Sequence, residues 1–153
     1  HFNHPQEIVE PCKTAAQTLR EAGFMLLNQT VLLRGVNDDA ETLKTLCREL
    51  LYTLGIKPYY LHHCDLTRGL THFRTTIAEG LELMNQLRGH MSGLGVPQYM
   101  LDLPGGNGKI PLGPSYTIHH DGYDWSFRNF QGKTCHYHEV VPQNPAPVRD
   151  PDR

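Results

Sequence analysis

The sequence has few of the features that several large classes of protein require. Its four cysteines are spread singly, with no CxxC pair and no CxxxCxxC motif; they are Cys12, Cys47, Cys64 and Cys135. This spacing argues against a zinc site or a redox pair, and scattered thiols suit a reducing compartment better than a disulfide framework does. We therefore expect a cytoplasmic protein, with no metal site in this chain.

Long apolar runs and charge of one sign are also missing. No run approaches the roughly 20 apolar residues that span a bilayer, and the opening His-Phe-Asn-His is unlike a signal peptide. The 14 Lys and Arg nearly balance the 16 Asp and Glu, for a net charge of -2. This balance predicts neither a nucleic-acid partner nor a membrane partner. Because the chain opens without Met and inside a polar cluster, we interpret it as a piece of a longer protein.

Short apolar runs alternate with longer amphipathic ones, which indicates βα units and a mostly parallel sheet. Leucines at helical spacing support the second helix, which Asp38 or Asp39 can cap. The predicted helices cover residues 11–22, 39–54 and 76–90, and the predicted strands lie within 24–33, 57–61 and 96–101.

After Gly105 the pattern changes. Residues 115–119 and 125–130 are typical of two strands joined by the turn at Asp121-Gly122, which predicts a hairpin. From Pro142 onward four prolines remove backbone donors, so we expect the tail to be disordered.

Three or four βα units amount to about half of an eight-stranded barrel of roughly 250 residues. In such folds the chemistry lies at the carboxyl ends of the strands. That rule selects four polar segments in this chain, namely residues 1–4, 34–38, 62–65 and 102–109.

The most informative segment is the run Pro-Gly-Gly-Asn-Gly that leads into Lys109. Its backbone N–H groups could face a phosphate. A nucleotide-binding P-loop fails twice, because Leu103 stands where glycine is needed and Ile110 where Ser or Thr is needed. A lysine beside such a loop can instead form a Schiff base with an aldehyde cofactor. The alternative is a solvated lysine in a glycine turn.

Two aspartates, Asp65 and Asp102, fall just past predicted strand ends. Two carboxylates converging on a cleft would suit an ammonium group on a substrate, although capping is the commoner use of Asp at such positions. The adjacent His62 and His63 point to opposite faces of a strand, so a shared metal ion is not expected. The run from Cys135 to His138 alternates in the same way, which favours a surface strand.

Seven motifs occur in one order: His-Phe-Asn-His-Pro-x-Glu, Gln-Thr-Val-Leu-Leu-Arg-Gly-Val-Asn-Asp, Pro-Tyr-Tyr, Cys-Asp-Leu, His-Phe-Arg-Thr, Leu-Arg-Gly-His and Asp-x-Pro-Gly-Gly-x-Gly-Lys. Together they closely resemble the lysine 2,3-aminomutase family over residues 1–139. The resemblance implies the C-terminal part of an incomplete (β/α) radical-SAM barrel, followed by the hairpin region and a tail over residues 140–153. It also implies an isomerase that is a homo-oligomer when complete.

The family uses S-adenosylmethionine, a [4Fe-4S] cluster and pyridoxal phosphate to move the α-amino group of L-lysine to the β carbon. By motif, Lys109 corresponds to the lysine that binds pyridoxal phosphate. Asp65 and Asp102 correspond to the carboxylates that hold the substrate's distal ammonium, and His1 and Gln29 to positions near S-adenosylmethionine. The cluster ligands lie outside this chain, so we expect the isolated chain to be inactive.

Three departures from the family pattern matter. Asp39 stands where some members place a zinc-binding cysteine, and only Cys135 remains of their C-terminal cysteine motif, so no zinc site is expected. Asn107 replaces one glycine of the loop and tolerates positive φ better than most residues. Two alternatives remain: a pyridoxal-phosphate-binding or structural remnant without radical chemistry, or an aminomutase for another amino acid such as glutamate. Glutamate-acting relatives carry non-acidic residues at the positions of Asp65 and Asp102.

Overall fold

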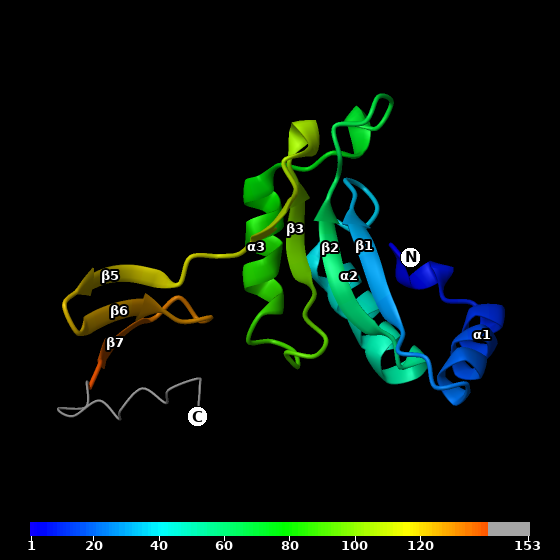
Figure 1. The fold of residues 1–153 in the computed structure, drawn as a ribbon, viewed down its shortest axis with the longest axis horizontal. Helices are drawn as coiled ribbons and strands as arrows, with labels where there is room; N and C mark the ends of the chain where they lie inside the picture. Colours follow the sequence, from blue (N-terminus) through cyan, green and yellow to red (C-terminus); the bar gives the residue numbers. More distant parts are fainter. Residues whose placement is uncertain (141–153) are drawn as a thin grey trace, which may run out of the picture. The chain divides into compact units, whose positions relative to one another are not determined.

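The computed structural model describes residues 1–140 and divides the chain into two compact units, His1–Pro114 and a second unit that begins at Ser115 (Figure 1). Residues 141–153, on which most of the predicted disordered tail falls, lie outside the described residues. Within the described part, no helix is long and apolar enough to cross a membrane.

The first unit is built on a four-stranded sheet, with strand order β1-β2-β3-β4. Its strands are β1 (Leu27–Leu32), β2 (Lys57–His63), β3 (Gln98–Asp102) and β4 (Lys109–Leu112). The first three strands run parallel, as the alternating sequence pattern predicted, and β4 returns antiparallel to β3. The fold of this unit is therefore α/β with a mixed sheet.

Strand β4 was not predicted. After β3 the chain makes one short 3-10 turn, η4 (Pro104–Gly106), and the loop closes where the Leu103 N–H donates to the Gly108 carbonyl at 2.9 Å. Lys109 then pairs with Asp102 across the two strands. Lys109 therefore follows the loop, as the sequence indicated, and also opens a strand, so that its backbone is held by the sheet.

The predicted helices are present with small shifts at their ends. They are α1 (Glu10–Glu21), α2 (Ala40–Arg48) with a π-helical continuation η2 (Glu49–Leu54), and α3 (Ile77–Leu87); short 3-10 turns cover η1 (Pro5–Glu7) and η3 (Thr71–Phe73). Of the two candidate caps, Asp39 accepts from the Thr42 N–H at 2.9 Å, whereas Asp38 accepts from the Gly35 N–H. Thr76 begins α3 in a capping box with Glu79.

Helices α2 and α3 cover one face of the sheet (Figure 1). Alternate residues of the strands point into this layer, and together with the helices they form the main core: Leu32, Leu43, Leu61, Leu83, Met84, Leu87 and Tyr99. A second cluster joins α1 to the end of α2 and to η2; it contains Ala16, Leu46, Leu50, Leu54 and Ile56. His63 also lies on this side and contacts the hydroxyl of buried Tyr99 at 2.7 Å.

The opposite face of the sheet lies outside this core. A bulge in the pairing of β1 with β2 changes which side chains reach that face. The register of β1 against β2 slips between Asn28 and Gln29, so that Asn28 pairs with Pro58 and Gln29 with Tyr60. Two successive residues, Tyr59 and Tyr60, are therefore half-buried with stacked rings, while the residues flanking them are buried.

The second unit is a three-stranded antiparallel sheet of β5 (Thr117–Asp121), β6 (Asp124–Arg128) and β7 (Thr134–His138). The predicted hairpin is confirmed as β5 and β6. The predicted surface strand is confirmed as β7, where His136 and His138 contact Ser126 and Asp124 of the neighbouring strand.

Candidate functional site

Three polar side chains meet on the face of the sheet that faces away from α2 and α3. The Lys109 ammonium lies 2.6 Å from the Asp102 carboxylate and 3.2 Å from Nδ1 of His62. The same Nδ1 lies 3.5 Å from Asp102. Because these residues come from β4, β3 and β2, the sheet register brings them together near the carboxyl ends of the parallel strands.

The charges in this cluster are set by the ion pair. Lys109, by hydrogen bond and charge, holds the pKa of Asp102 below its ordinary value. Burial, and next the charge of Lys109, lower the pKa of His62, so its imidazole is neutral at neutral pH. An ammonium can only donate, so Nδ1 of neutral His62 is the acceptor and Nε2 carries the ring proton. With His62 neutral, the 3.5 Å approach of Nδ1 to Asp102 is neither a salt bridge nor a hydrogen bond, because both atoms are acceptors.

Aromatic rings border the cluster. The Tyr60 ring centroid lies 5.9 Å from the Lys109 ammonium and meets the His62 ring edge-on at 5.4 Å. Tyr59 stacks on Tyr60 at 3.7 Å, with their hydroxyls 2.8 Å apart. That hydrogen bond is the main cause that raises the pKa of Tyr60. The bulge in β2 thus supplies a flat aromatic surface beside a lysine amine.

The glycine-rich loop leads directly into this cluster. Gly105, Gly106 and Gly108 all have positive φ, which explains glycine there without any close approach of backbone. A Cβ at Gly106 or Gly108 would meet nothing within 4 Å, so the space beside the loop is open. Asn107 has a negative φ, and its side chain donates to the Pro104 carbonyl at 2.6 Å. Its tolerance of positive φ is therefore not used.

The other predicted site residues lie outside this cluster, at different places. Gln29 is on β1, with Tyr60 as its neighbour on β2. Asp65 follows β2 and is exposed; its charge acts on His62, as that of Asp102 does, and also on His63, while among the described residues its carboxylate makes no hydrogen bond or ion pair. His1 lines a hollow with Leu27 and Ile56, at the amino-terminal ends of β1 and β2.

The segment after His1 is held against the outer edge of β1. Phe2 exchanges two hydrogen bonds with the Asn28 side chain, and the Asn3 side chain accepts from the Val31 N–H at 2.8 Å. Asn37, fully buried, donates to the Asn3 carbonyl at 2.8 Å. Side-chain amides thus satisfy backbone groups that a neighbouring strand would otherwise bind.

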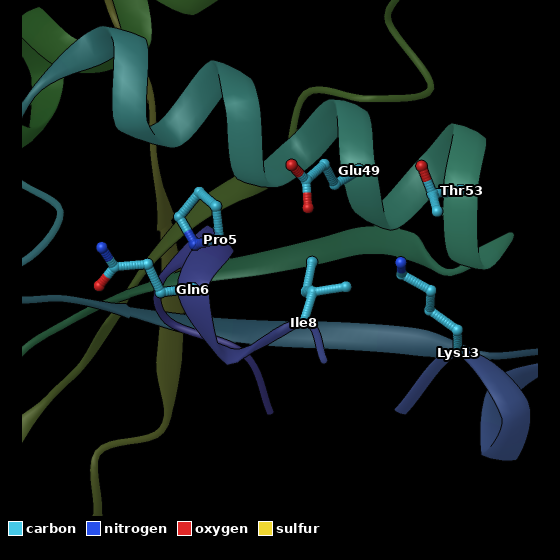
Figure 2. Close-up of a pocket in the computed structure, with 6 residues that line it drawn as sticks. All are labelled: Pro5, Gln6, Ile8, Lys13, Glu49 and Thr53. Atoms are coloured by element: carbon cyan, nitrogen blue, oxygen red, sulfur yellow. The ribbon is translucent and has the colours of Figure 1, made fainter. Parts of the chain in front are cut away.

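A separate hollow of about 460 Å³ lies between η1, α1 and η2 and is shown in Figure 2. Glu49 and Thr53 project into it from η2, opposite Pro5, Gln6, Ile8 and Lys13. Lys13 pairs with Glu10 at an exposed position. None of these side chains belongs to the cluster of His62, Asp102 and Lys109.

Comparison with known proteins identifies the family. A family model described as lysine-2,3-aminomutase matches residues 84–150, which include β3, the glycine-rich loop and Lys109. An L-lysine 2,3-aminomutase from Clostridium subterminale is 46% identical over 146 residues, 95% of this chain. One from Fusobacterium nucleatum subsp. nucleatum is 43% identical over 153 residues, 100% of this chain. The chain belongs to the lysine 2,3-aminomutase family.

The members of the lysine 2,3-aminomutase family that this chain matches are much longer. The matched region is 35% of the Clostridium subterminale protein and 36% of the Fusobacterium protein, so the chain spans about a third of each. A glutamate 2,3-aminomutase from Clostridioides difficile is also similar, at 42% identity over 134 residues, 87% of this chain and 31% of that relative. Family membership alone therefore leaves the substrate open.

The residues of the cluster would fit pyridoxal phosphate, the cofactor that the family resemblance implies. Lys109 presents a primary amine, the glycine-rich loop leaves open space for an anionic group, and Tyr60 offers a ring beside the amine. Nε2 of His62 is buried and has no hydrogen-bond partner among the described residues. A buried polar atom without a partner is costly, so a polar group of a bound molecule would be favoured there.

Sequence reasoning did not anticipate that His62 and Tyr60 would lie beside Lys109. Period-two alternation from buried Leu61 puts His62 on the same face as the site, but its meeting with Asp102 depends on how β2 and β3 are paired. The bulge that exposes Tyr59 and Tyr60 on neighbouring positions leaves no signal in the sequence itself.

Proposed function

We propose that the complete protein is an aminomutase that moves the α-amino group of L-lysine to the β carbon, and that this chain holds pyridoxal phosphate on Lys109. One observation carries the proposal: an amine on β4 faces a carboxylate on β3, at the end of a glycine-rich loop and beside an aromatic surface. Family membership supports the aminomutase class.

Asp102 favours a basic substrate. In the structure its carboxylate binds an alkylammonium, that of Lys109, at 2.6 Å. The distal group of the substrate lysine is the same chemical group, a primary ammonium on a four-carbon chain. With Lys109 engaged by the cofactor, the Asp102 carboxylate would be available to the ammonium of the substrate. Asp65, whose charge reaches the same strand end, is proposed to hold the ammonium from the other side.

Glutamate is the second candidate because a relative named glutamate 2,3-aminomutase is 42% identical. The distal group of glutamate is a carboxylate, which would face the carboxylate of Asp102. Like charges that leave water together are poorly screened, and the repulsion would cost several kcal/mol. We therefore propose lysine, or a close basic analogue, as the substrate.

Each candidate site residue of this chain has a proposed role. Lys109 binds the cofactor, Asp102 and Asp65 orient the substrate through its distal ammonium, and Gln29 and His1 contact S-adenosylmethionine. When bound, the pyridoxal phosphate would stabilise the migrating nitrogen, while S-adenosylmethionine and a [4Fe-4S] cluster would supply the radical. The cluster ligands would lie in the part of the relatives that this chain does not match.

Reductive trapping tests the assignment of Lys109. The complete protein is loaded with pyridoxal phosphate, reduced with borohydride and digested, and the labelled peptide is mapped by mass spectrometry. The label is expected on Lys109 and should disappear in Lys109→Ala. The matched control is Lys57→Ala, whose amine binds the Leu94 carbonyl beyond the amino end of β2. Label on another lysine would remove the basis of the proposal.

A further inference from the structure

One nitrogen base faces the amine that the proposed function makes reactive. Nδ1 of His62 lies 3.2 Å from the Lys109 ammonium and is the acceptor of that contact. The side chain of His62 is only 14% exposed, whereas those of Lys109 and Asp102 are 34% and 40% exposed. The imidazole is therefore the least exposed member of the cluster.

Resting on the proposed function, we propose that His62 accepts the proton of the Lys109 ammonium when Lys109 reacts with the aldehyde of the cofactor. An ammonium has no free electron pair, so Lys109 must lose one proton before it can attack a carbonyl carbon. The acceptor has to lie within hydrogen-bond reach of that proton, which His62 does.

The step balances without any further reactant. An Nζ–H bond of Lys109 breaks, an Nδ1–H bond of His62 forms, and the positive charge passes to the imidazole. The freed electron pair on Nζ bonds the aldehyde carbon. A second Nζ proton moves to the oxygen, and His62 returns its proton to the same oxygen, which leaves as water. The product is a protonated C=N link, and His62 is neutral again.

Asp102 is the other possible acceptor, but it is the weaker base. A carboxylate has an ordinary pKa of about 3.9 and an imidazole about 6.5, against about 10.4 for a lysine ammonium. By these ordinary values, transfer to His62 is less uphill than transfer to Asp102.

Once Lys109 has lost its proton, the charges around His62 favour the protonated imidazole. The positive charge of Lys109 is one of the causes that lower the pKa of His62, and it vanishes when the proton leaves. The charged groups that then face the imidazole are Asp102 from β3 and Asp65 after β2, both of which favour its protonated form. Tyr60, which is on the same strand as His62, meets the imidazole ring edge-on. Met100, which pairs with His62 on β3, is uncharged.

The test measures how fast pyridoxal phosphate attaches to Lys109 in the complete protein, without S-adenosylmethionine or substrate. Samples are quenched with borohydride at short times, and the Lys109 peptide is quantified by mass spectrometry at several pH values. His62→Ala should slow attachment at neutral pH by about a hundredfold, the lower end of general acid–base effects, with the same final extent of labelling. Added imidazole should restore the rate.

One further variant tests whether His62 acts as a base or only positions Lys109, and a second serves as a control. His62→Gln keeps a hydrogen-bond acceptor but is not a base, so it should be as slow as His62→Ala. His138→Ala is the control, because His138 also contacts a carboxylate, that of Asp124 at 2.7 Å, but belongs to the other unit. It should attach cofactor at the unaltered rate.

The outcomes are distinguishable. An unchanged rate in His62→Ala would show that solvent takes the proton and would overturn the proposal, while label on Lys109 would leave the proposed function intact. A slow rate that imidazole does not restore, or that His62→Gln recovers, would mean that His62 only positions the lysine. Label on a different lysine would overturn both.

Discussion

Gly80, in the first turns of α3, should tolerate no side chain, although it lies inside a helix. A Cβ built there would overlap Oη and Cζ of Tyr99 and lie 2.7 Å from Cε1. Tyr99 is fully buried, and its hydroxyl contacts His63 at 2.7 Å, so the ring has no free direction in which to move. The helix and β3 can approach this closely only because glycine has no side chain.

The change in the free energy of unfolding caused by Gly80→Ala has three contributions. Better helix propensity would stabilise the folded state by about 1 kcal/mol. Overpacking costs about 1–3 kcal/mol, and displacement of the ring loses a hydrogen bond worth about 1 kcal/mol. The net expectation is a loss of about 1–3 kcal/mol in the free energy of unfolding. Helix propensity alone predicts the opposite sign.

Urea unfolding of the chain, followed by far-ultraviolet circular dichroism, measures the difference. Gly93→Ala is the control, since a Cβ there would meet nothing within 4 Å and its φ is not positive. In a double-mutant cycle, Tyr99→Leu should remove most of the added cost of Gly80→Ala. A Gly80→Ala variant as stable as the parent, or more stable, would refute the packing of Tyr99 over Gly80.

Three more predictions concern the cap, the carboxylates and the isolated chain. Asp39→Ala should cost about 1 kcal/mol at neutral pH. The Thr42 hydrogen bond lowers the pKa of Asp39 in the folded state, so its stabilisation is present above the unfolded pKa of about 3.9 and is lost as pH falls through the lower folded value. Urea unfolding of parent and variant should therefore converge at strongly acid pH, and a constant difference would contradict this. In the complete protein, Asp65→Asn or Asp102→Asn should lower kcat/KM for lysine about tenfold to a hundredfold, because a charge-assisted contact of about 1.5–3 kcal/mol is lost; near-normal kinetics in both would exclude an ammonium clamp. The isolated chain should not convert lysine, as it lacks CxxxCxxC, and measured turnover would contradict that origin of the radical.

Local patterns in the sequence predicted most of the first unit. Leucines at helical spacing before Gly55, with Asp38 or Asp39 as the cap, indicated α2, and the short run from Lys57 to Leu61 indicated β2. These elements follow from residues that are neighbours along the chain. Strand β4 was missed because Lys109–Leu112 contains a proline and only four residues, and it forms only by pairing with β3. Its existence depends on a partner, which a local pattern does not contain.

By itself, the sequence determined the family, the α/β character of the chain and the candidate residues Lys109, Asp65 and Asp102, because motif order and periodicity are properties of the chain alone. Only the tertiary structure decided which of these residues meet. It joined Lys109 to Asp102, gave Asp65 no ion pair among the described residues and added His62. The physical reason is register: a shift of one residue between β2 and β3 would turn His62 to the other face of the sheet.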